Sequence, residues 1–259
     1  MSNIKTPSEQ AFMRTACRAS ARVLDAVTRQ ARPGITTREL DDYAAECIDK
    51  IGGQSAFLGY KGFPRHSCIS VNDEVVHGIG SQREIEFGDI VSIDIGVKID
   101  GFIGDNAKTV IVGECDIKTQ KLIEVTEASL YAGISCAVAG NRVSDISRAI
   151  QDLVESSGFS VVREFVGHGV GRTMHEDPQV PNFVEPRKKS AELRPGMTLA
   201  IEPMVNAGKA AVKVLRDGWT VVTRDGRPSV HFEHTILVRD GEAEVLTCLE
   251  ETKYGLNAV

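Results

Sequence analysis

The sequence predicts a single mixed α/β domain, spanning residues 1–259, that is built from two related halves. Each half shows the same order of helix, break, helix, glycine and strands, and no linker or low-complexity segment divides the chain. With 42% hydrophobic and 25% charged residues, the chain has the composition of an ordinary globular protein and is long enough to bury a substantial core. We therefore expect both halves to contribute helices and strands to one shared sheet.

The first half begins with two predicted helices. Residues 7–30 carry apolar side chains at helical spacing. The apolar stripe comprises Phe12, Ala16, Ala19, Val23, Ala26 and Val27. After a break at residues 32–34, a second helix is expected over residues 36–53, with a capping box formed by Thr36 and Glu39 at its start and glycines at its end.

The second half repeats this order. Helices are expected over residues 121–140 and 141–158, with Ser144 as a plausible N-cap of the latter. A shift of 106 residues superimposes three landmarks, which place Gly34 on Gly140, Leu40 on Ile146 and Gly52 on Gly158. The remaining apolar runs predict strands over residues 67–72, 90–97, 102–112, 161–166, 197–204, 211–216 and 230–238.

Composition excludes several functional classes. A formal net charge of −6 argues against a nucleic-acid-binding surface. No apolar run reaches the length of a membrane span, and the polar first residues lack the apolar core of a signal peptide. The six cysteines are scattered without a C-x-x-C pair, so we expect neither a disulfide framework nor a zinc knuckle, and a reducing cytoplasm fits best.

A hairpin that carries two aspartates is predicted around Asp100-Gly101, a strong two-residue turn signal. If these residues form the tip, positions that sum to 201 pair across the hairpin, and Gly96 faces Asp105. Asp94 then lies diagonally beside Asp105 on the same face, and Gly96 leaves space over Asp105. Two carboxylates this close repel each other unless a cation is present. Two solvent-facing aspartates on an edge hairpin would give the same pattern.

Three more candidate ligands lie in or beside apolar runs. Glu202 and Glu233 interrupt strand-like segments, and His168 lies in a glycine-rich loop, GHGVGRTMHEDP, at residues 167–178. Taken singly, each is more simply an exposed acid or a turn residue. Taken together, four carboxylates carry a charge of −4 that two divalent cations would balance, so the set predicts a buried dinuclear metal site. Zinc-finger and H-E-x-x-H patterns are absent.

These motifs resemble those of the methionine aminopeptidases, metallopeptidases of the pita-bread fold. The resemblance covers nearly the whole chain and rests on the spacing of Asp94 and Asp105, GHGVGRTMHEDP, AIEPM (200–204), FEHT (232–235), CISVNDEVVHGI (68–79) and DGWTVVTRDG (217–226). It implies pseudo-two-fold halves with a curved antiparallel sheet flanked by helices. Only thirty residues separate Glu202 from Glu233, too few for the helical insertion of type II members. The chain is therefore similar to the short bacterial type I form, which lacks an N-terminal extension.

The resemblance also assigns the metal ligands. It implies that Asp94, Asp105, His168, Glu202 and Glu233 bind two divalent ions, with Asp105 and Glu233 bridging both. Asp94 would serve one ion, while His168 and Glu202 serve the other. Such an oxygen-rich site suits manganese, iron(II) or cobalt(II), with zinc also compatible.

Further roles follow from the same resemblance. Glu202 would also shuttle a proton, and the non-ligand histidines His77 and His175 would orient the peptide and donate hydrogen bonds to it. The pocket for the methionine side chain would comprise Phe57, Tyr60, Phe63, Cys68, Met174 and Trp219. Plain core packing of these aromatic side chains is the alternative. The chain departs from many bacterial members at Phe57, Met174, Gly96 and Ile103. His66, His231 and His234 are interpreted as structural.

The predicted function is removal of the N-terminal methionine from nascent polypeptides with a small second residue. The expected partners are nascent N-termini near the ribosome, with no nucleic acid or membrane required, and the enzyme would be a cytoplasmic monomer. A proline-specific relative of the same fold is one alternative, although such enzymes carry a large N-terminal domain. A non-catalytic pita-bread module that binds protein or RNA is another, but such modules have usually lost metal ligands.

Overall fold

The computed structural model describes residues 4–186 and 189–249. One nine-stranded antiparallel sheet runs through both halves of the chain, in the order β1-β4-β5-β14-β9-β7-β8, with β2 paired to β4 and β15 to β14. The halves meet where β5 (Phe102–Ile111) pairs with β14 (Glu233–Leu237). This pairing brings Glu233 of the second half beside the aspartates of the first.

The remaining strands of the main sheet are short except for β4. They are β1 (Gln54–Ser55), β2 (Cys68–Val71), β4 (Ile90–Ile99), β7 (Gly167–Gly169), β8 (Glu176–Val180), β9 (Thr198–Ile201) and β15 (Glu244–Val245). Two three-stranded sheets have the orders β13-β10-β6 and β11-β12-β3. They comprise β3 (Glu74–Val76), β6 (Ser160–Val161), β10 (Met204–Asn206), β11 (Val212–Val214), β12 (Val221–Thr223) and β13 (Ser229–His231).

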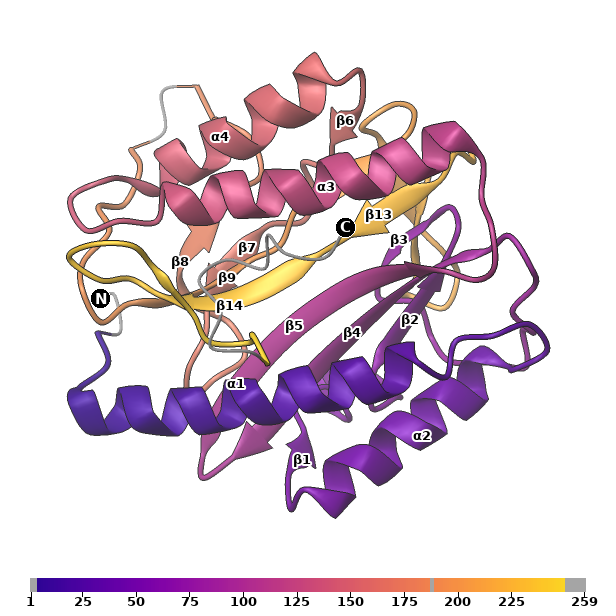
Figure 1. Ribbon diagram of the computed structural model, residues 1–259, viewed down its shortest axis with the longest axis horizontal. Coiled ribbons are helices and arrows are strands. Elements are labelled where there is room, and N and C mark those ends of the chain that lie inside the picture. Colours follow the sequence, from indigo (N-terminus) through magenta and orange to yellow (C-terminus); the bar gives the residue numbers. More distant parts are fainter. Residues whose placement is uncertain (1–3, 187–188, 250–259) are drawn as a thin grey trace.

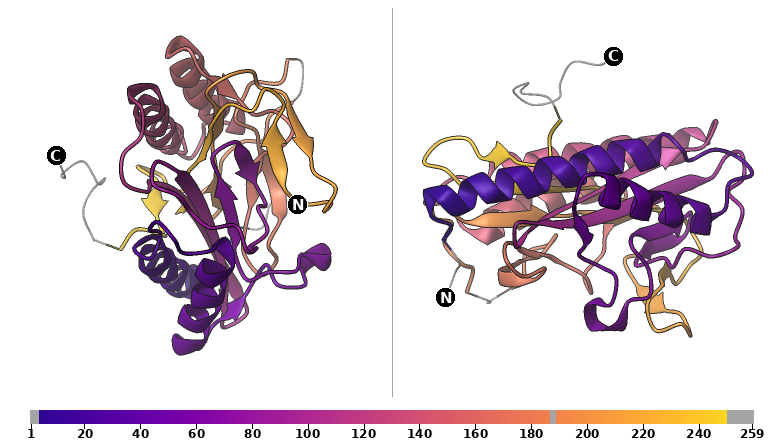
Figure 2. Two further views of the ribbon diagram at one scale, coloured as in Figure 1. Left: turned by 90° about the vertical axis from the view of Figure 1, so that its right-hand side faces the viewer. Right: turned by 90° about the horizontal axis from the view of Figure 1, so that it is seen from below.

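Four α-helices cover one face of the main sheet (Figure 1). The helices α1 (Pro7–Thr28) and α2 (Thr37–Lys50) lie over the first half, and α3 (Ile117–Ser135) and α4 (Val143–Ser156) lie over the second. Each pair packs on its own hydrophobic cluster. On the opposite side, the loop that contains the short 3₁₀ helix η1 (Tyr60–Gly62) and the hairpin β11–β12 project from the sheet (Figure 2). The helices leave that face free for a site.

The predicted two-fold repeat is visible in the backbone. Gly34 and Gly140 have φ angles of 86° and 90°, and Gly52 and Gly158 have φ angles of 70° and 85°. These left-handed conformations favour glycine and turn the chain before and after the second helix of each half. The 106-residue offset therefore relates positions with the same backbone geometry.

The helix starts are equivalent too, with one correction. Thr36 and Glu39 form the predicted capping box of α2. The predicted N-cap Ser144 is wrong, because α4 begins at Val143 and its N-cap position is Arg142, two residues before Ser144. The Asp145 carboxylate accepts the Arg142 backbone N–H at 2.7 Å, and the Ser190 hydroxyl, rather than a capping side chain, accepts the Ser144 backbone N–H at 2.8 Å.

Phe12 is another correction. It was expected in the buried stripe of α1, but it is 42% exposed, with its ring stacked on that of Phe102 at a centroid distance of 5.5 Å. Ala26 is only partly buried. Met13 and Cys17 are fully buried instead. The buried face of α1 is therefore the one that carries Met13, Ala16 and Cys17 rather than Phe12. On this face α1 approaches the sheet closely at Gly104.

The long strands predicted in the second half are interrupted. The segment 197–204 divides into β9 and β10 at Glu202-Pro203, where proline has no N–H to donate, and 230–238 divides into β13 and β14 at Phe232. Beyond Val161 the segment predicted as a strand to residue 166 has no strand. Phe165 and Val166 are apolar because their side chains line a cavity. The strand β8 was not predicted, since its sequence contains a proline.

Candidate metal centre and substrate cavity

The predicted hairpin register is confirmed. In the β4–β5 ladder Gly96 lies opposite Asp105, and Asp94 lies opposite Ala107. Ala107 in turn lies opposite Glu233 on β14. Cross-strand partners point to the same face of a sheet, so Asp94 and Glu233 flank the small side chain of Ala107, and Asp105, two residues away on β5, points to the same face. Three carboxylates thus share one face.

The sequence predicts empty space over Asp105, because Gly96 has no side chain. In the structure this space is filled. A Cβ atom at Gly96 would lie 2.6 Å from Cε1 of Phe57, so the phenylalanine ring occupies the position above the glycine. Gly96 and Phe57 are therefore coupled. Any side chain at residue 96 would displace the ring.

Glu202 and Glu233 lie where the chain passes from one sheet to the other. Glu202 separates β9 of the main sheet from β10, and Glu233 begins β14 directly after β13 and Phe232. The two crossings are neighbours, because Ile201 pairs with His234 and Met204 pairs with His231. The paired breaks in the strands bring both glutamates to the aspartates of the hairpin.

His168 lies in a strand rather than in the flexible loop that its glycines indicated. It belongs to β7, which is paired to β9 and β8. A Cβ atom at Gly167 would lie 2.4 Å from the Ala200 carbonyl oxygen, and one at Gly169 would lie 2.6 Å from that of Asp177. These glycines permit close approach of backbones on both sides, and this fixes the imidazole.

The tautomer of His168 follows from its contacts. Its Nδ1 lies 2.9 Å from the Gly169 carbonyl oxygen, which can only accept, so Nδ1 carries the proton. The lone pair of Nε2 then points to the carboxylates, 3.4 Å from Glu202 Oε1 and 3.7 Å from Asp105 Oδ2. Burial lowers the pKa of His168 to about 3, so the ring is neutral near pH 7. A neutral, oriented imidazole is the form that ligates metals.

The carboxylates lie in an environment that penalises their charge. Burial raises the pKa of Asp94 to about 7. Burial, followed by repulsion from neighbouring carboxylates, raises the pKa values of Asp105, Glu202 and Glu233 well above their usual range. Without a cation, these groups would bind protons to relieve the repulsion.

The side chains present fit divalent cations. Ligand atoms of Asp105, His168 and Glu233 lie within 4.8 Å of one another. Within the described parts of the chain, Asp94 Oδ1, Asp105 Oδ1 and Glu233 Oε1 are buried without a hydrogen-bond partner. A buried oxygen with no donor is costly, and a cation would satisfy all three. The arrangement can therefore act as a metal centre.

A cavity of about 180 Å³ opens onto this cluster. All five predicted ligands line it, as do His77, His175 and the six predicted pocket residues Phe57, Tyr60, Phe63, Cys68, Met174 and Trp219. The cavity is smaller than the roughly 300–1,000 Å³ of sites for drug-sized ligands, so it suits a single side chain. Its wall is aromatic and sulfur-containing, with Trp219 edge-on to Phe63 at 5.1 Å.

The two predicted non-ligand histidines line the same cavity as the carboxylates. The ring of His175 is 4.2 Å from that of His168 between centroids, and its Nδ1 is hydrogen-bonded to the Tyr60 hydroxyl at 2.8 Å. Burial and the nearby His175 lower the pKa of His77 to about 4. His77 also has a φ angle of 58°, an unusual conformation for a residue other than glycine. Both imidazoles can offer a neutral N–H donor to a bound peptide.

Sequence reasoning missed several lining residues. Lys61, Val76, Phe165, Val166 and Met204 also line the cavity. Val76 and Met204 lie within quoted motifs but had no pocket role assigned, and the other three lie outside the motifs. His231, interpreted as structural, has its Nε2 3.7 Å from Glu202 Oε2. The side chain of His234 bonds to Thr247 and Tyr131, and that of His66 does not line the cavity.

Comparison with known proteins defines the class of this site. Residues 11–240 match the model of metallopeptidase family M24, so the chain belongs to this family of metal-dependent peptidases. It is 51% identical over 243 residues to methionine aminopeptidase 1 of Bacillus subtilis, covering 94% of this chain and 98% of the relative. Methionine aminopeptidase from Thermotoga maritima superposes with a TM-score of 0.93 at 47% identity, covering 95% and 99% of the two chains. The predicted family and pita-bread fold are confirmed.

A proline-specific relative shares the fold only. The prolidase from Pyrococcus horikoshii has a TM-score of 0.77 at 23% identity, and the match covers 95% of this chain but 64% of that enzyme. The likeness therefore shows the common architecture and gives no support to proline specificity.

Proposed function

We propose that this chain is a methionine aminopeptidase that removes the N-terminal methionine from polypeptides with a small second residue. The observation that carries the proposal is the position of the buried acidic cluster at a cavity for one side chain, lined by aromatic and sulfur-containing residues. The high identity to enzymes of that name over nearly their full length supports it.

The proposed ligands of two divalent cations are Asp94, Asp105, His168, Glu202 and Glu233. Two such ions would balance the four negative charges that burial otherwise penalises. Bound there, the ions would polarise the scissile carbonyl and acidify a water molecule. One imidazole among four carboxylates suits manganese, iron(II), cobalt(II) or zinc.

The proposed proton carrier is Glu202. Its buried carboxylate lies beside the proposed metal positions, with Oε1 3.4 Å from Nε2 of His168, so it would accept a proton from the attacking water and release it to the leaving amine. His77 and His175 would donate N–H bonds to the scissile peptide as charge develops on its oxygen. If the Tyr60 hydroxyl donates to Nδ1 of His175, the proton of that neutral ring lies on Nε2. Tyr60 then sets which nitrogen donates.

The proposed methionine pocket holds the thioether by contact with aromatic rings and sulfur. Phe57 lies edge-on to Phe63 at 6.5 Å between centroids, and Cys68 and Met174 are buried on the same wall. Polarizable sulfur favours such surroundings. The pocket would therefore select an unbranched, apolar first residue.

The substrates we propose are newly made polypeptides, met in the cytoplasm by a monomeric enzyme. None of the helices in residues 4–186 and 189–249 combines the length and apolarity needed to cross a bilayer. All six cysteines are free, which agrees with a reducing compartment.

A peptide assay tests the function. Metal-loaded protein should hydrolyse Met-Ala-Ser and leave Ala-Pro-Ala intact, with metal content measured on the same sample. Cleavage of Ala-Pro-Ala instead would assign proline specificity. Two results would favour the non-catalytic binding module instead. One is tight metal binding without turnover of either peptide, and the other is a protein that binds no divalent ion.

A further inference from the structure

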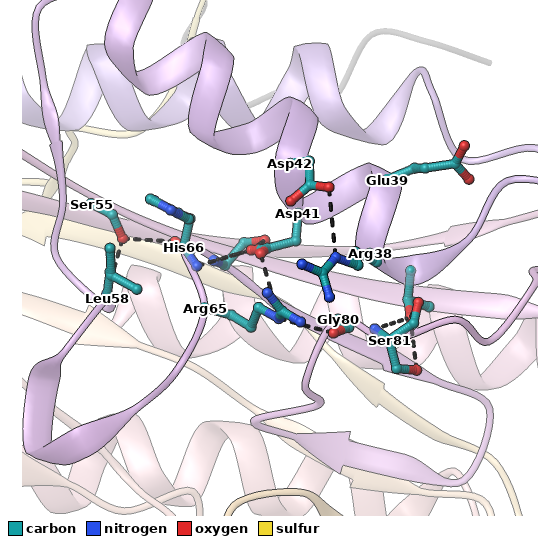
Figure 3. A network of polar contacts seen from close by, with 12 residues as sticks. Arg38, Glu39, Asp41, Asp42, Ser55, Leu58, Arg65, His66, Gly80 and Ser81 are labelled. Carbon is teal, nitrogen blue, oxygen red and sulfur yellow. Dashed lines mark hydrogen bonds and ion pairs between the residues drawn. The ribbon is translucent and has the colours of Figure 1, made fainter.

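Behind the cavity, a chain of polar contacts connects three of the segments that line it. Figure 3 shows this network, which runs from Ser55 through His66, Asp41 and Arg65 to Gly80. None of these five residues lines the cavity. The network nevertheless touches the backbone next to several residues that do.

Asp41, on α2, is the centre of the network. Its Oδ1 accepts the backbone N–H groups of His66 and Ser67 at 3.0 and 2.8 Å and the Ser67 hydroxyl at 2.8 Å. Its side chain is 1% exposed. Three donors on one buried oxygen fix the chain directly before Cys68, the first residue of β2 and part of the cavity wall.

A second branch leads to Phe57. The Ser55 hydroxyl donates to the His66 carbonyl at 2.9 Å, and its oxygen accepts the backbone N–H groups of Phe57 and Leu58 at 3.2 Å each. The loop with the Phe57 ring is therefore tied to the same peptide that Asp41 holds.

A third branch leads to His77. The other oxygen of Asp41, Oδ2, has no hydrogen bond and lies 3.9 Å from Arg65 Nε, which donates to the Gly80 carbonyl at 3.0 Å. Gly80 fits closely over α2, because a Cβ atom there would lie 3.0 Å from Asp41 Cβ. His77 is three residues earlier, with its left-handed φ of 58°. A strained conformation persists only where neighbouring contacts determine it.

We propose that Asp41, acting with Arg65, is a positioning residue for the aminopeptidase reaction. The pair fixes the position of His77 relative to Phe57 and Cys68 of the cavity wall. This inference rests on the proposed function. Neither side chain lines the cavity, so their effect passes through His77, Phe57 and Cys68. Loss of the pair should change turnover without removing the metals.

The same helix offers a matched control. Arg38 Nε lies 3.9 Å from Asp42 Oδ2, the same separation as in the Arg65–Asp41 pair. Both side chains of the control pair are exposed, and they are drawn beside the network in Figure 3. Arg38→Met and Asp42→Asn should therefore leave activity on Met-Ala-Ser within about twofold of the parent, since exposed pairs contribute little.

The test is a double-substitution cycle on the metal-loaded enzyme. Arg65→Met should lower kcat for Met-Ala-Ser on the order of tenfold, because small displacements of a catalytic group are costly. In a His77→Ala background, Arg65→Met should cost less than about twofold, since the group it positions is already gone. Equal losses in both backgrounds, or no loss in the His77 parent, would overturn the proposal.

Asp41 variants separate positioning from folding. Asp41→Asn keeps an oxygen that accepts from His66 and Ser67, so it should retain more activity than Asp41→Ala at equal metal content. If Asp41→Ala does not fold, the Arg65→Met cycle decides alone. A parent enzyme that does not cleave Met-Ala-Ser refutes the function, whereas an active parent with Arg65→Met equal to Arg38→Met refutes only the positioning role.

Discussion

The two halves of the molecule supply the same acidic cluster by different means. The first half contributes Asp94 and Asp105 from one hairpin whose strands are ten residues each and pair without interruption. The second half contributes His168, Glu202 and Glu233 from strands of three to five residues and from the breaks between them. A continuous ladder fixes neighbours through its register, whereas a broken one places them where the chain changes sheets.

This contrast explains why the aspartates could be paired from sequence and the glutamates could not. The turn at Asp100-Gly101 fixes every rung of the hairpin, so one local signal determines the distance between two side chains. Glu202 and Glu233 become neighbours only because Ile201 pairs with His234 across the sheet. If both halves serve one metal site, substitutions in either should have equal consequences.

The largest effect is expected at the shared ligands. Asp105→Asn in the first half and Glu233→Gln in the second should each lower kcat/KM for Met-Ala-Ser at least a thousandfold, about 4 kcal/mol, because each removes a proposed bridging charge. Metal analysis and kinetics on both variants check this, with exposed Asp49→Asn as a control. If one variant alone retained both ions and its activity, the two halves would not contribute equally to one metal site.

The histidines should follow, with about a hundredfold loss of kcat for His77→Ala in the first half and for His175→Ala in the second. Both variants should keep their metals, because neither side chain is a proposed ligand. Metal content and kcat measured together check this. Loss of metal from either variant would show that the division of roles is wrong.

A third comparison concerns the metal-free protein. Since burial raises the pKa of Asp94 from 3.8 to about 7, the folded chain keeps a proton that the unfolded chain releases. The stability of the folded chain with a protonated, neutral Asp94 is fully present below pH 3.8. It is lost as the pH rises through about 7, where Asp94 must become charged while buried. Asp94→Asn should therefore stabilise the metal-free protein increasingly between about pH 4 and 7, with a plateau above.

Thermal melts of wild type and Asp94→Asn across this pH range test the prediction. With metal bound the sign should reverse, because the substitution removes a ligand and ligand binding stabilises the folded state. A pH-independent difference in the metal-free proteins would mean that Asp94 is not buried with its neighbours.

The smallest effect is expected at Phe57. Phe57→Cys would open the wall beside Gly96 and should shift the ratio of kcat/KM for Leu-Ala-Ser to Met-Ala-Ser by about 1–3 kcal/mol toward the bulkier residue. Metal content should stay constant. If Phe57 only packs the core, the variant should instead lose a few kcal/mol of stability with unchanged ratios.

Features that depend on local signals could be predicted from the amino-acid sequence. The capping box at Thr36, the glycines with positive φ and the hairpin register each arise from residues close together in the chain. The resemblance of the motifs added the five proposed ligands, all of which line one cavity. Local patterns fix backbone geometry because turns, caps and alternation act over a few residues.

How these parts meet depends on the folded chain as a whole. The tertiary structure placed His168 in a strand held by close glycine contacts, divided the two long strands at Glu202 and Phe232, and filled the space over Gly96 with Phe57. It also joined Asp41 to Arg65 and Gly80, which no spacing in the sequence indicates. These contacts depend on which backbones approach each other across the sheet, and that is set by packing of the whole chain rather than by neighbours in sequence.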